Sequence, residues 1–253
     1  MALYYLYKLV KEFHPEVDPY LPLFLLLIFP TAFFLNAIYT ESLFLFLSVV
    51  AFYYAFKKNF LWAGIFAGLA SITRVTGVLL FIPLMWEYLQ MCDFKLARIF
   101  GPKILPIFLA PLGILSFFLY HYFRFGDFLL FFKVESWWGR AFNLNKDHFS
   151  LFSHPATINF LTDAGFAIFI LTIIYLVFRH LRVSYGLYML AVVAVALSSG
   201  TLMSIGRYVL VLFPIYIIGA SLKSRFSQQV WVLASILLLA LNIMLFVNNY
   251  WAG

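Results

Sequence analysis

Long apolar runs, separated by short polar turns, repeat along the whole of this 253-residue chain and constrain its fold more than any other feature. Hydrophobic residue types make up 65% of the sequence and charged types only 11%, more apolar surface than a water-soluble core needs. In a lipid bilayer the backbone must satisfy its hydrogen bonds internally, which favours helices. The sequence therefore predicts an all-α fold: a polytopic transmembrane helical bundle in a multi-pass integral membrane protein.

The apolar runs divide the chain into about nine candidate segments. Several are shorter than the roughly 20 residues that a full span needs, which indicates broken or tilted helices. Before them, Met1–Val10 is largely apolar, with Lys8 near its end and Lys11 after it, the reverse of the charge order in a signal peptide. This start is typical of the last turns of a helix, so we expect a fragment or a truncated reading frame. The segments are Leu21–Ile38, Leu43–Phe56, Phe60–Ile72, Val75–Leu89, Ile104–Phe123, Asn159–Phe178, Tyr185–Leu197, Tyr208–Leu222 and Val230–Val247.

The lysines and arginines predict the orientation of the segments. With the N-terminus in the cytoplasm, every tight basic cluster falls on the inner side, as the positive-inside rule requires. The net charge of +7 then reflects loops that face anionic lipid, and we expect no nucleic-acid partner. The inner set is Lys8, Lys11, Lys57, Lys58, Lys95, Arg98, Lys103, Arg179, Arg182, Lys223 and Arg225; the outer set is Arg74, Arg124, Lys133, Arg140, Lys146 and Arg207. This gives N-terminal helices in residues 1–123, one long exoplasmic loop in 124–158 and C-terminal helices in 159–253.

Glu41 and Arg74 are lone charges between apolar runs, at two predicted outer turns. Such residues are costly in hydrocarbon, so they tend to be interfacial, paired or functional. Glu41 suits the first turn of a helix capped by Thr40, or an outer cavity, where it would act as a base, an acceptor for a sugar hydroxyl or a metal ligand. Arg74 suits snorkelling to the headgroups, or pairing with Glu41 or with a bound anion. The nearby Gly64, Gly68 and Gly77 predict close helix approach.

Two further outer stretches carry candidate binding residues. In Ser136-Trp-Trp-Gly-Arg, the indoles of Trp137 and Trp138 fit either an interfacial belt or a platform that stacks on a sugar beside Arg140. Arg207 fits an interfacial anchor, or an anion site at the start of a helix that continues through Phe213-Pro214.

The sequence lacks the motifs of soluble nucleotide and metal chemistry. It contains no Gly-rich phosphate loop, no dinucleotide fingerprint and no Ser-His-Asp order. The single cysteine, Cys92, excludes an internal disulfide, and His148 and His154 are too loosely spaced for a metal site. We therefore assign no residue as a metal ligand and leave open whether the protein requires a divalent metal. Because no nucleotide-binding motif is present, we expect the sugar donor to be carried on a lipid.

Taken together, these stretches resemble the PIG-V-like mannosyltransferases, which are polytopic GT-C glycosyltransferases related to the enzyme that adds the second mannose of GPI anchors. The likeness covers roughly Phe29 to Ile217 and follows the family's order. It rests on Ala37-Ile-Tyr-Thr-Glu-Ser-Leu-Phe, Gly68-Leu-Ala-Ser-Ile-Thr-Arg-Val-Thr-Gly, Ser136-Trp-Trp-Gly-Arg, and Ser204-Ile-Gly-Arg-Tyr with Phe213-Pro214.

The resemblance implies transfer of a hexose, in this family mannose, from a polyprenyl-phosphate donor to a glycan or glycolipid acceptor at the exoplasmic face. It implies inversion by direct displacement, with an acidic residue as base. Glu41 is the candidate catalytic residue, and the candidate substrate-binding residues are Tyr39, Ser42, Arg74, Trp137, Trp138, Arg140 and Arg207. GT-C enzymes carry their main acid in a first outer loop that this sequence does not show. Three explanations stay open: an incomplete protein, a partner subunit that supplies the base, or a larger role for Glu41.

Two rival interpretations remain. The first is a transporter or lipid-handling membrane protein without catalysis. It is disfavoured because the charges gather at outer helix ends rather than at the bilayer midplane, and because no internal repeat stands out. The second is a decayed gene without function. The membrane itself is left open between a bacterial or archaeal plasma membrane and the endoplasmic reticulum.

Overall fold

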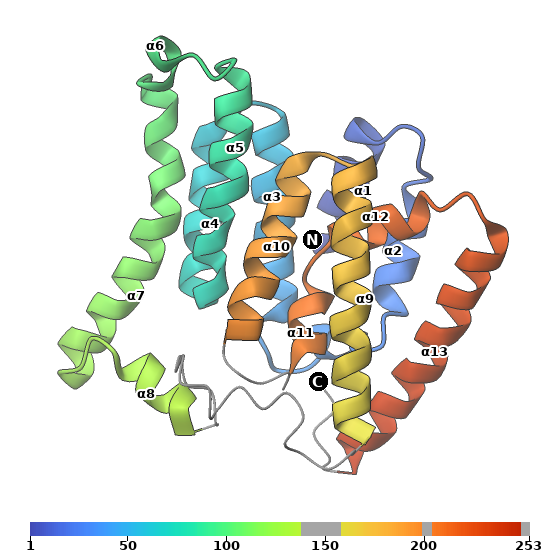
Figure 1. Ribbon diagram of the computed structural model, residues 1–253. Helices are drawn as coiled ribbons and strands as arrows, with labels where there is room; N and C mark the ends of the chain where they lie inside the picture. Colours follow the sequence, from blue (N-terminus) through green and yellow to red (C-terminus); the bar gives the residue numbers. More distant parts are fainter. Residues whose placement is uncertain (138–157, 199–203, 249–253) are drawn as a thin grey trace.

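The protein is all-helical throughout the part of the chain that the structure, a computed structural model, describes: residues 1–137, 158–198 and 204–248 (Figure 1). The α-helices are α1 (Ala2–Phe13), α2 (Tyr20–Leu27), α3 (Glu41–Phe56), α4 (Phe60–Thr73), α5 (Phe81–Met91), α6 (Leu96–Ile99), α7 (Leu109–Phe125), α8 (Leu130–Trp137), α9 (Ile158–His180), α10 (Val183–Ser198), α11 (Ile205–Leu210), α12 (Pro214–Ala220) and α13 (Arg225–Val247). Short 3-10 helices precede α3, α5 and α7: η1 (Ala32–Leu35), η2 (Val75–Leu80) and η3 (Pro102–Phe108).

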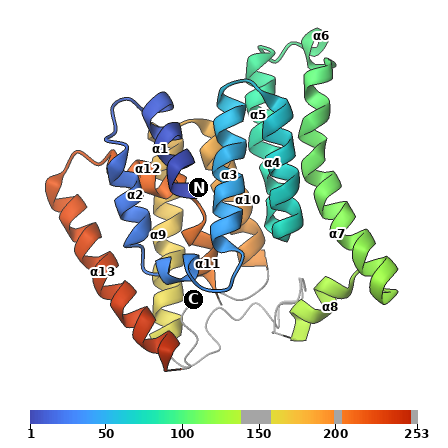
Figure 2. The same ribbon diagram turned by 180° about the vertical axis from the view of Figure 1, so that it is seen from behind.

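Helix α3 lies at the centre of the bundle. It is apolar on all sides and most of its residues are buried, as expected for a helix enclosed by others. It packs against α4 on one side and α1 on the other (Figure 2). On a further face the ring of Phe52 contacts Tyr185 of α10 and Phe213, with ring centroids 5.3 and 5.2 Å apart. The core is therefore built around this helix, whose first residue is Glu41.

Glycines bring α4 into close contact with the segment that follows α6, as the sequence predicts. A Cβ on Gly64 would lie 1.9 Å from the carbonyl oxygen of Pro106, and one on Gly113 would lie 2.4 Å from that of Gly68. Neither position has room for a larger residue, so these backbones pack directly against each other.

Two helical stretches are long and apolar enough to cross a membrane within the described residues: Pro102–Phe125, which joins η3 to α7, and Arg225–Val247, which is α13. Both are largely exposed and lie on opposite outer edges of the bundle (Figure 1). The other apolar helices, Glu41–Phe56, Phe60–Thr73, Val75–Met91, Ala164–His180 and Val183–Ser198, are shorter.

Two of the predicted apolar segments are not single helices. Leu21–Ile38 breaks because α2 ends at Leu27, three residues before Pro30, whose nitrogen cannot donate to the preceding turn. Tyr208–Leu222 also breaks, into α11 and α12. Pro214 has no N–H to give to the carbonyl of Leu210, and the hydroxyl of Tyr216 donates to that oxygen instead, at 2.7 Å.

Candidate functional site

The carboxylate of Glu41 is fully buried and bound by two arginines from distant parts of the chain. Arg74 donates from Nη1 to Glu41 Oε1 at 2.8 Å. Arg207 donates from Nε and Nη2 to the same oxygen, at 2.8 and 2.5 Å. The guanidinium side chains keep 14% and 17% of their surface exposed, whereas Glu41 keeps none. Charge-assisted bonds of this kind are among the strongest in proteins.

Breaks between helices place the three residues at one point. Glu41 begins α3, and Arg74 lies between α4 and η2 in an extended conformation. Arg207 lies in the short α11, which follows Ser204 in a left-handed conformation with φ of 65°. Thr31 supports this arrangement, since its hydroxyl donates to the carbonyl of Gly206 at 3.0 Å.

Aromatic rings fix the orientation of both guanidinium groups. Arg207 lies 5.0 Å from the ring centroid of Phe34 and 4.5 Å from that of Tyr39. Arg74 lies 5.7 Å from Phe44 and 5.6 Å from Tyr208. The planar guanidinium suits such faces, and these contacts hold each group against the protein while part of it still reaches solvent.

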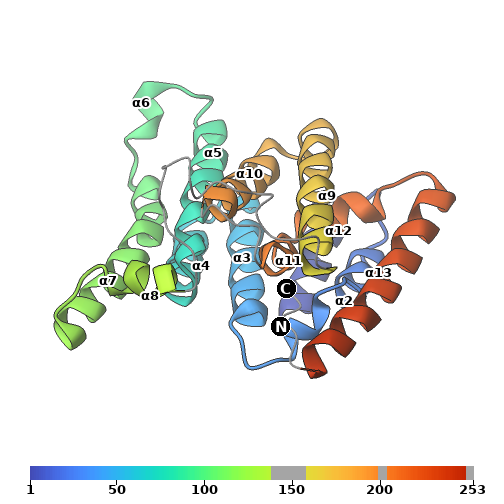
Figure 3. The same cartoon turned by 60° about the horizontal axis from the view of Figure 1, so that its bottom comes forward.

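The two arginines line a polar pocket of about 260 Å³ at the end of the bundle where α3 begins. Seen from that end (Figure 3), α8 lies next to α7, and α11 lies between α3 and α9. Glu41 lies behind the arginines and is not part of the lining. The lining residues are Thr40, Thr73, Arg74, Val75, Thr76, Phe131, Glu135, Ser204, Arg207 and Tyr208.

Two buried oxygens beside this pocket have no hydrogen-bond partner within the described residues: Glu41 Oε2 and Thr76 Oγ1. Buried polar atoms are usually paired, so these two are candidates for a hydrogen bond with a group that enters the pocket. Thr76 lines the pocket, and Glu41 directly follows Thr40, which also lines it. Three other buried atoms without a partner among the described residues, Ser48 Oγ, Trp86 Nε1 and Tyr188 OH, belong to residues outside its lining.

The structure brings together only some of the residues that the sequence singled out. Glu41, Arg74 and Arg207 meet, and the pairing of Arg74 with Glu41, one of the predicted alternatives, is present. Tyr39 joins them through its ring. Ser42 is exposed on α3, and the exposed Trp137 ends α8; neither lines the pocket. The predictions for Trp138 and Arg140 lie outside the described residues.

Two local predictions need correction. Thr40 stands at the N-cap of α3 as expected, but its side chain makes no capping hydrogen bond. The predicted helix that starts near Arg207 and carries Phe213-Pro214 is also wrong, because α11 and α12 are separate. The charge of Arg207 therefore does not add to free amides at the start of a long helix.

Sequence reasoning missed Glu135, Thr76 and Tyr208 in the pocket lining. Of these three residues, Glu135 is the one whose position in the sequence could have identified it. It directly precedes Ser136-Trp-Trp-Gly-Arg, a stretch that the sequence analysis had already singled out.

A second buried carboxylate, Glu87, was also missed, and it lies at the other end of the bundle. It accepts hydrogen bonds from Ser184 at 2.8 Å and Lys58 at 3.1 Å, and Arg182 lies 3.6 Å away. Lys58 and Arg182 were both predicted to face the cytoplasm, so their meeting agrees with the predicted grouping of charges. Lys58 lines a pocket of about 430 Å³ beside Asn59 and Lys103, and Glu87 is not part of that lining.

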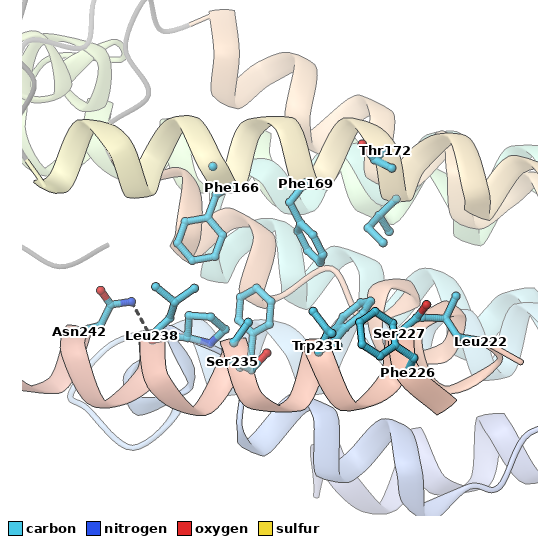
Figure 4. Close-up of a pocket in the computed structure, with 16 residues that line it drawn as sticks. Phe166, Phe169, Thr172, Leu222, Phe226, Ser227, Trp231, Ser235, Leu238 and Asn242 are labelled. Carbon is cyan, nitrogen blue, oxygen red and sulfur yellow. Dashed lines mark hydrogen bonds between the residues drawn. The ribbon is translucent and has the colours of Figure 1, made fainter. Parts of the chain in front are cut away.

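A large apolar pocket of about 760 Å³ lies between α9 and α13 (Figure 4). Phe166 and Phe169 project from α9 toward Trp231 and Leu238 of α13. At one end Asn242 donates to the carbonyl of Pro30 at 2.9 Å. A pocket of this size and lining suits an apolar ligand.

The apolar pocket adjoins the segment that carries Arg207. A Cβ on Gly206 would lie 3.0 Å from the ring of Phe166, which lines that pocket. Gly206 therefore lies between Phe166, in the wall of the apolar pocket, and Arg207, in the lining of the polar pocket.

The described residues contain no group of three or more His, Cys, Asp or Glu side chains that could hold a metal ion. The chain matches no protein-family model, no curated protein and no solved structure at a significant level.

Proposed function

We propose that this protein is a multi-pass membrane glycosyltransferase of the GT-C type, similar to the PIG-V-like mannosyltransferases. It transfers a hexose, mannose by family likeness, from a polyprenyl-phosphate donor to a glycan or glycolipid acceptor at the exoplasmic face. The observation that carries the proposal is the pair of arginines that shares one buried carboxylate at the edge of a polar pocket.

The charge balance at the pocket surface favours an anionic ligand. Arg74 and Arg207 line the pocket, whereas Glu41, the carboxylate that they share, lies behind them. With Glu135 as the one carboxylate among the described residues of the lining, the pocket surface carries one excess positive charge. Guanidinium groups bind phosphate oxygens in a geometry that lysine cannot match. We assign Arg74 and Arg207 to the phosphate of the donor, where they stabilise the charge that develops as the phosphate leaves.

In this scheme Glu41 is a positioning residue. Its Oε1 accepts all three arginine bonds, and its side chain has no exposed surface. It orders the guanidinium groups and reduces their mutual repulsion, rather than contacting the acceptor.

The apolar pocket between α9 and α13 supports a donor carried on lipid. Its wall at Phe166 touches Gly206, the residue next to Arg207. A phosphate held at Arg207 could therefore continue into an apolar chain that lies along this pocket. A soluble sugar nucleotide has no such chain, which favours the polyprenyl phosphate.

The multi-pass arrangement is part of the proposal. Two stretches have the length and composition of spans, and we infer that the shorter apolar helices also cross the bilayer within the bundle. We expect a cysteine introduced at Trp137 to react with an impermeant maleimide in intact cells, and one at Phe100 to react only after permeabilisation. Both native side chains are exposed, and the native Cys92 is buried. Labelling of both sites from one side would refute this topology.

Transfer of radiolabelled mannose from polyprenyl-phosphate mannose tests the function directly. Membranes that carry the chain are supplied with this donor and with octyl mannoside as acceptor. Arg207→Ala and Arg74→Ala should each abolish transfer. Arg182→Ala is the matched control, because Arg182 also lies near a buried carboxylate, but at the far end of the bundle. The assignment is wrong if the first two variants transfer mannose as well as the control does.

A lipid-handling protein without catalysis is the second candidate. The apolar pocket favours it, since a protein that only binds or moves lipid would need the same feature. In that case fluorescent lipid would be bound or translocated in liposomes, with no mannose transfer in membranes.

A further inference from the structure

Displacement at the anomeric carbon of a sugar requires a proton acceptor. An acceptor hydroxyl must lose its proton as its oxygen attacks, and a positioned side chain commonly accelerates such a step by about 10²- to 10⁴-fold. Glu41 does not fit this task, because it is buried behind the arginines and outside the pocket lining. A base supplied by this chain has to line the pocket, where an acceptor hydroxyl can reach it.

Glu135 meets this requirement. It lines the polar pocket together with Arg74 and Arg207, and it is the one carboxylate among the described residues of that lining. Phe131 precedes it by one turn of α8 and lines the same pocket, so the two side chains share the helix face that points there.

Aromatic contacts with α7 fix the orientation of α8. The ring of Phe131 lies 5.9 Å from that of Phe117, and Phe132 stacks on Phe118 at 5.6 Å. Consecutive residues of each helix make the two contacts, and their side chains point in directions about 100° apart around the helix axis. They set the rotation of α8 and with it the direction of Glu135.

Polar contacts hold the start of α8. Asp127 accepts a hydrogen bond from the backbone N–H of Leu129 at 3.0 Å and pairs with Lys133. The hydrogen bond from Lys133 lowers the pKa of Asp127, so its carboxylate stays charged in neutral solution. Glu135 therefore projects from a short helix anchored by both apolar and polar contacts.

We propose that Glu135 is the catalytic base, an inference that rests on the proposed function. The acceptor hydroxyl gives its proton to the Glu135 carboxylate while its oxygen bonds to the anomeric carbon. The bond from that carbon to the phosphate oxygen breaks, and both its electrons leave with polyprenyl phosphate, held by Arg74 and Arg207. The configuration at the anomeric carbon inverts.

The test compares Glu135→Gln with the unchanged chain in two assays on the same membranes. The first measures mannose transfer from polyprenyl-phosphate mannose to octyl mannoside, and the second measures binding of polyprenyl phosphate. We expect Glu135→Gln to lower the transfer rate by about 100-fold or more, with binding changed by less than about threefold. Formate should partly restore transfer to Glu135→Ala, since a small carboxylate can occupy the vacated space, but not to Glu135→Gln. Glu16→Gln, an exposed acid outside the pocket, is the matched control and should transfer normally.

The possible failures are distinguishable. If Glu135→Gln transfers mannose at close to the unchanged rate while Arg207→Ala does not, Glu135 is not the base, but the proposed function stands. If Glu135→Gln loses binding as well as transfer, or formate gives no rescue, the residue has a structural role and the inference is overturned. If the unchanged chain neither binds polyprenyl phosphate nor transfers mannose, the proposed function fails and this inference fails with it.

Discussion

Replacing Glu41 by alanine should destabilise this protein more than removal of any surface charge. The substitution leaves Arg74 and Arg207 facing each other with 14% and 17% of their side chains exposed. Removing one partner of a buried ion pair typically costs about 3–5 kcal/mol. Both guanidinium groups reach the pocket and lie over aromatic rings, so we expect the lower end, about 3 kcal/mol. Glu41→Gln keeps the volume and one acceptor oxygen and should cost about half as much.

Thermal unfolding of the purified chain in detergent micelles measures this cost. For a chain of this size, a loss of about 3 kcal/mol lowers Tm by roughly 6–12 °C. Glu87→Ala is the matched control, because Glu87 is equally buried and also has basic partners. Its partners Lys58 and Arg182 are 40% and 42% exposed and can turn into water, so we expect a smaller cost, about 1–2 kcal/mol.

The double variant Glu41→Ala, Arg207→Ala tests the physical cause. It leaves only one guanidinium without its partner, so it should be less destabilised than the sum of the single variants, by about 1 kcal/mol or more. If the two single effects simply add, or if Glu87→Ala costs as much as Glu41→Ala, then burial of the two arginines is not the source of the loss.

Three further substitutions test the packing, each by the same thermal unfolding. Gly64→Ala should cost about 1–3 kcal/mol, because its methyl group would meet the carbonyl of Pro106; an unchanged Tm would mean that the helices are not in direct contact there. Gly126→Ala should cost about 1 kcal/mol, since Gly126 ends α7 with φ of 72° in open space, and a stabilising effect would contradict that conformation. Asn242→Leu should cost about 1–3 kcal/mol by leaving the buried carbonyl of Pro30 unpaired, and no loss would show that this bond does not hold α13 in place.

Much of the fold follows from the apolar pattern of the sequence. Long runs without polar residues favour helices that pack on each other or face lipid, so the all-helical architecture is predictable. The central position of α3 is not, because α9 is similarly apolar on all sides. The breaks at Pro30 and Pro214 are harder to foresee. A proline interrupts a helix only if its surroundings satisfy the freed carbonyl, and at Leu210 that partner is the hydroxyl of Tyr216, six residues along the chain.

The candidate site was predictable in part, for a reason that separates Glu41 from Glu135. A charge between two apolar runs must find a partner of opposite sign, so Glu41 and two arginines at turns on one predicted side could be expected to meet. This reasoning uses only the free-energy cost of burying an unpaired charge. Glu135 lies on a half-exposed helix, where water already solvates a carboxylate and burial imposes no such demand. Its place in the pocket depends on the rotation of α8, which the rings of α7 determine. The cost of burial therefore identifies charges that must be paired, such as Glu41 and its two arginines, whereas the place of the solvated Glu135 in the pocket is found only from its three-dimensional position.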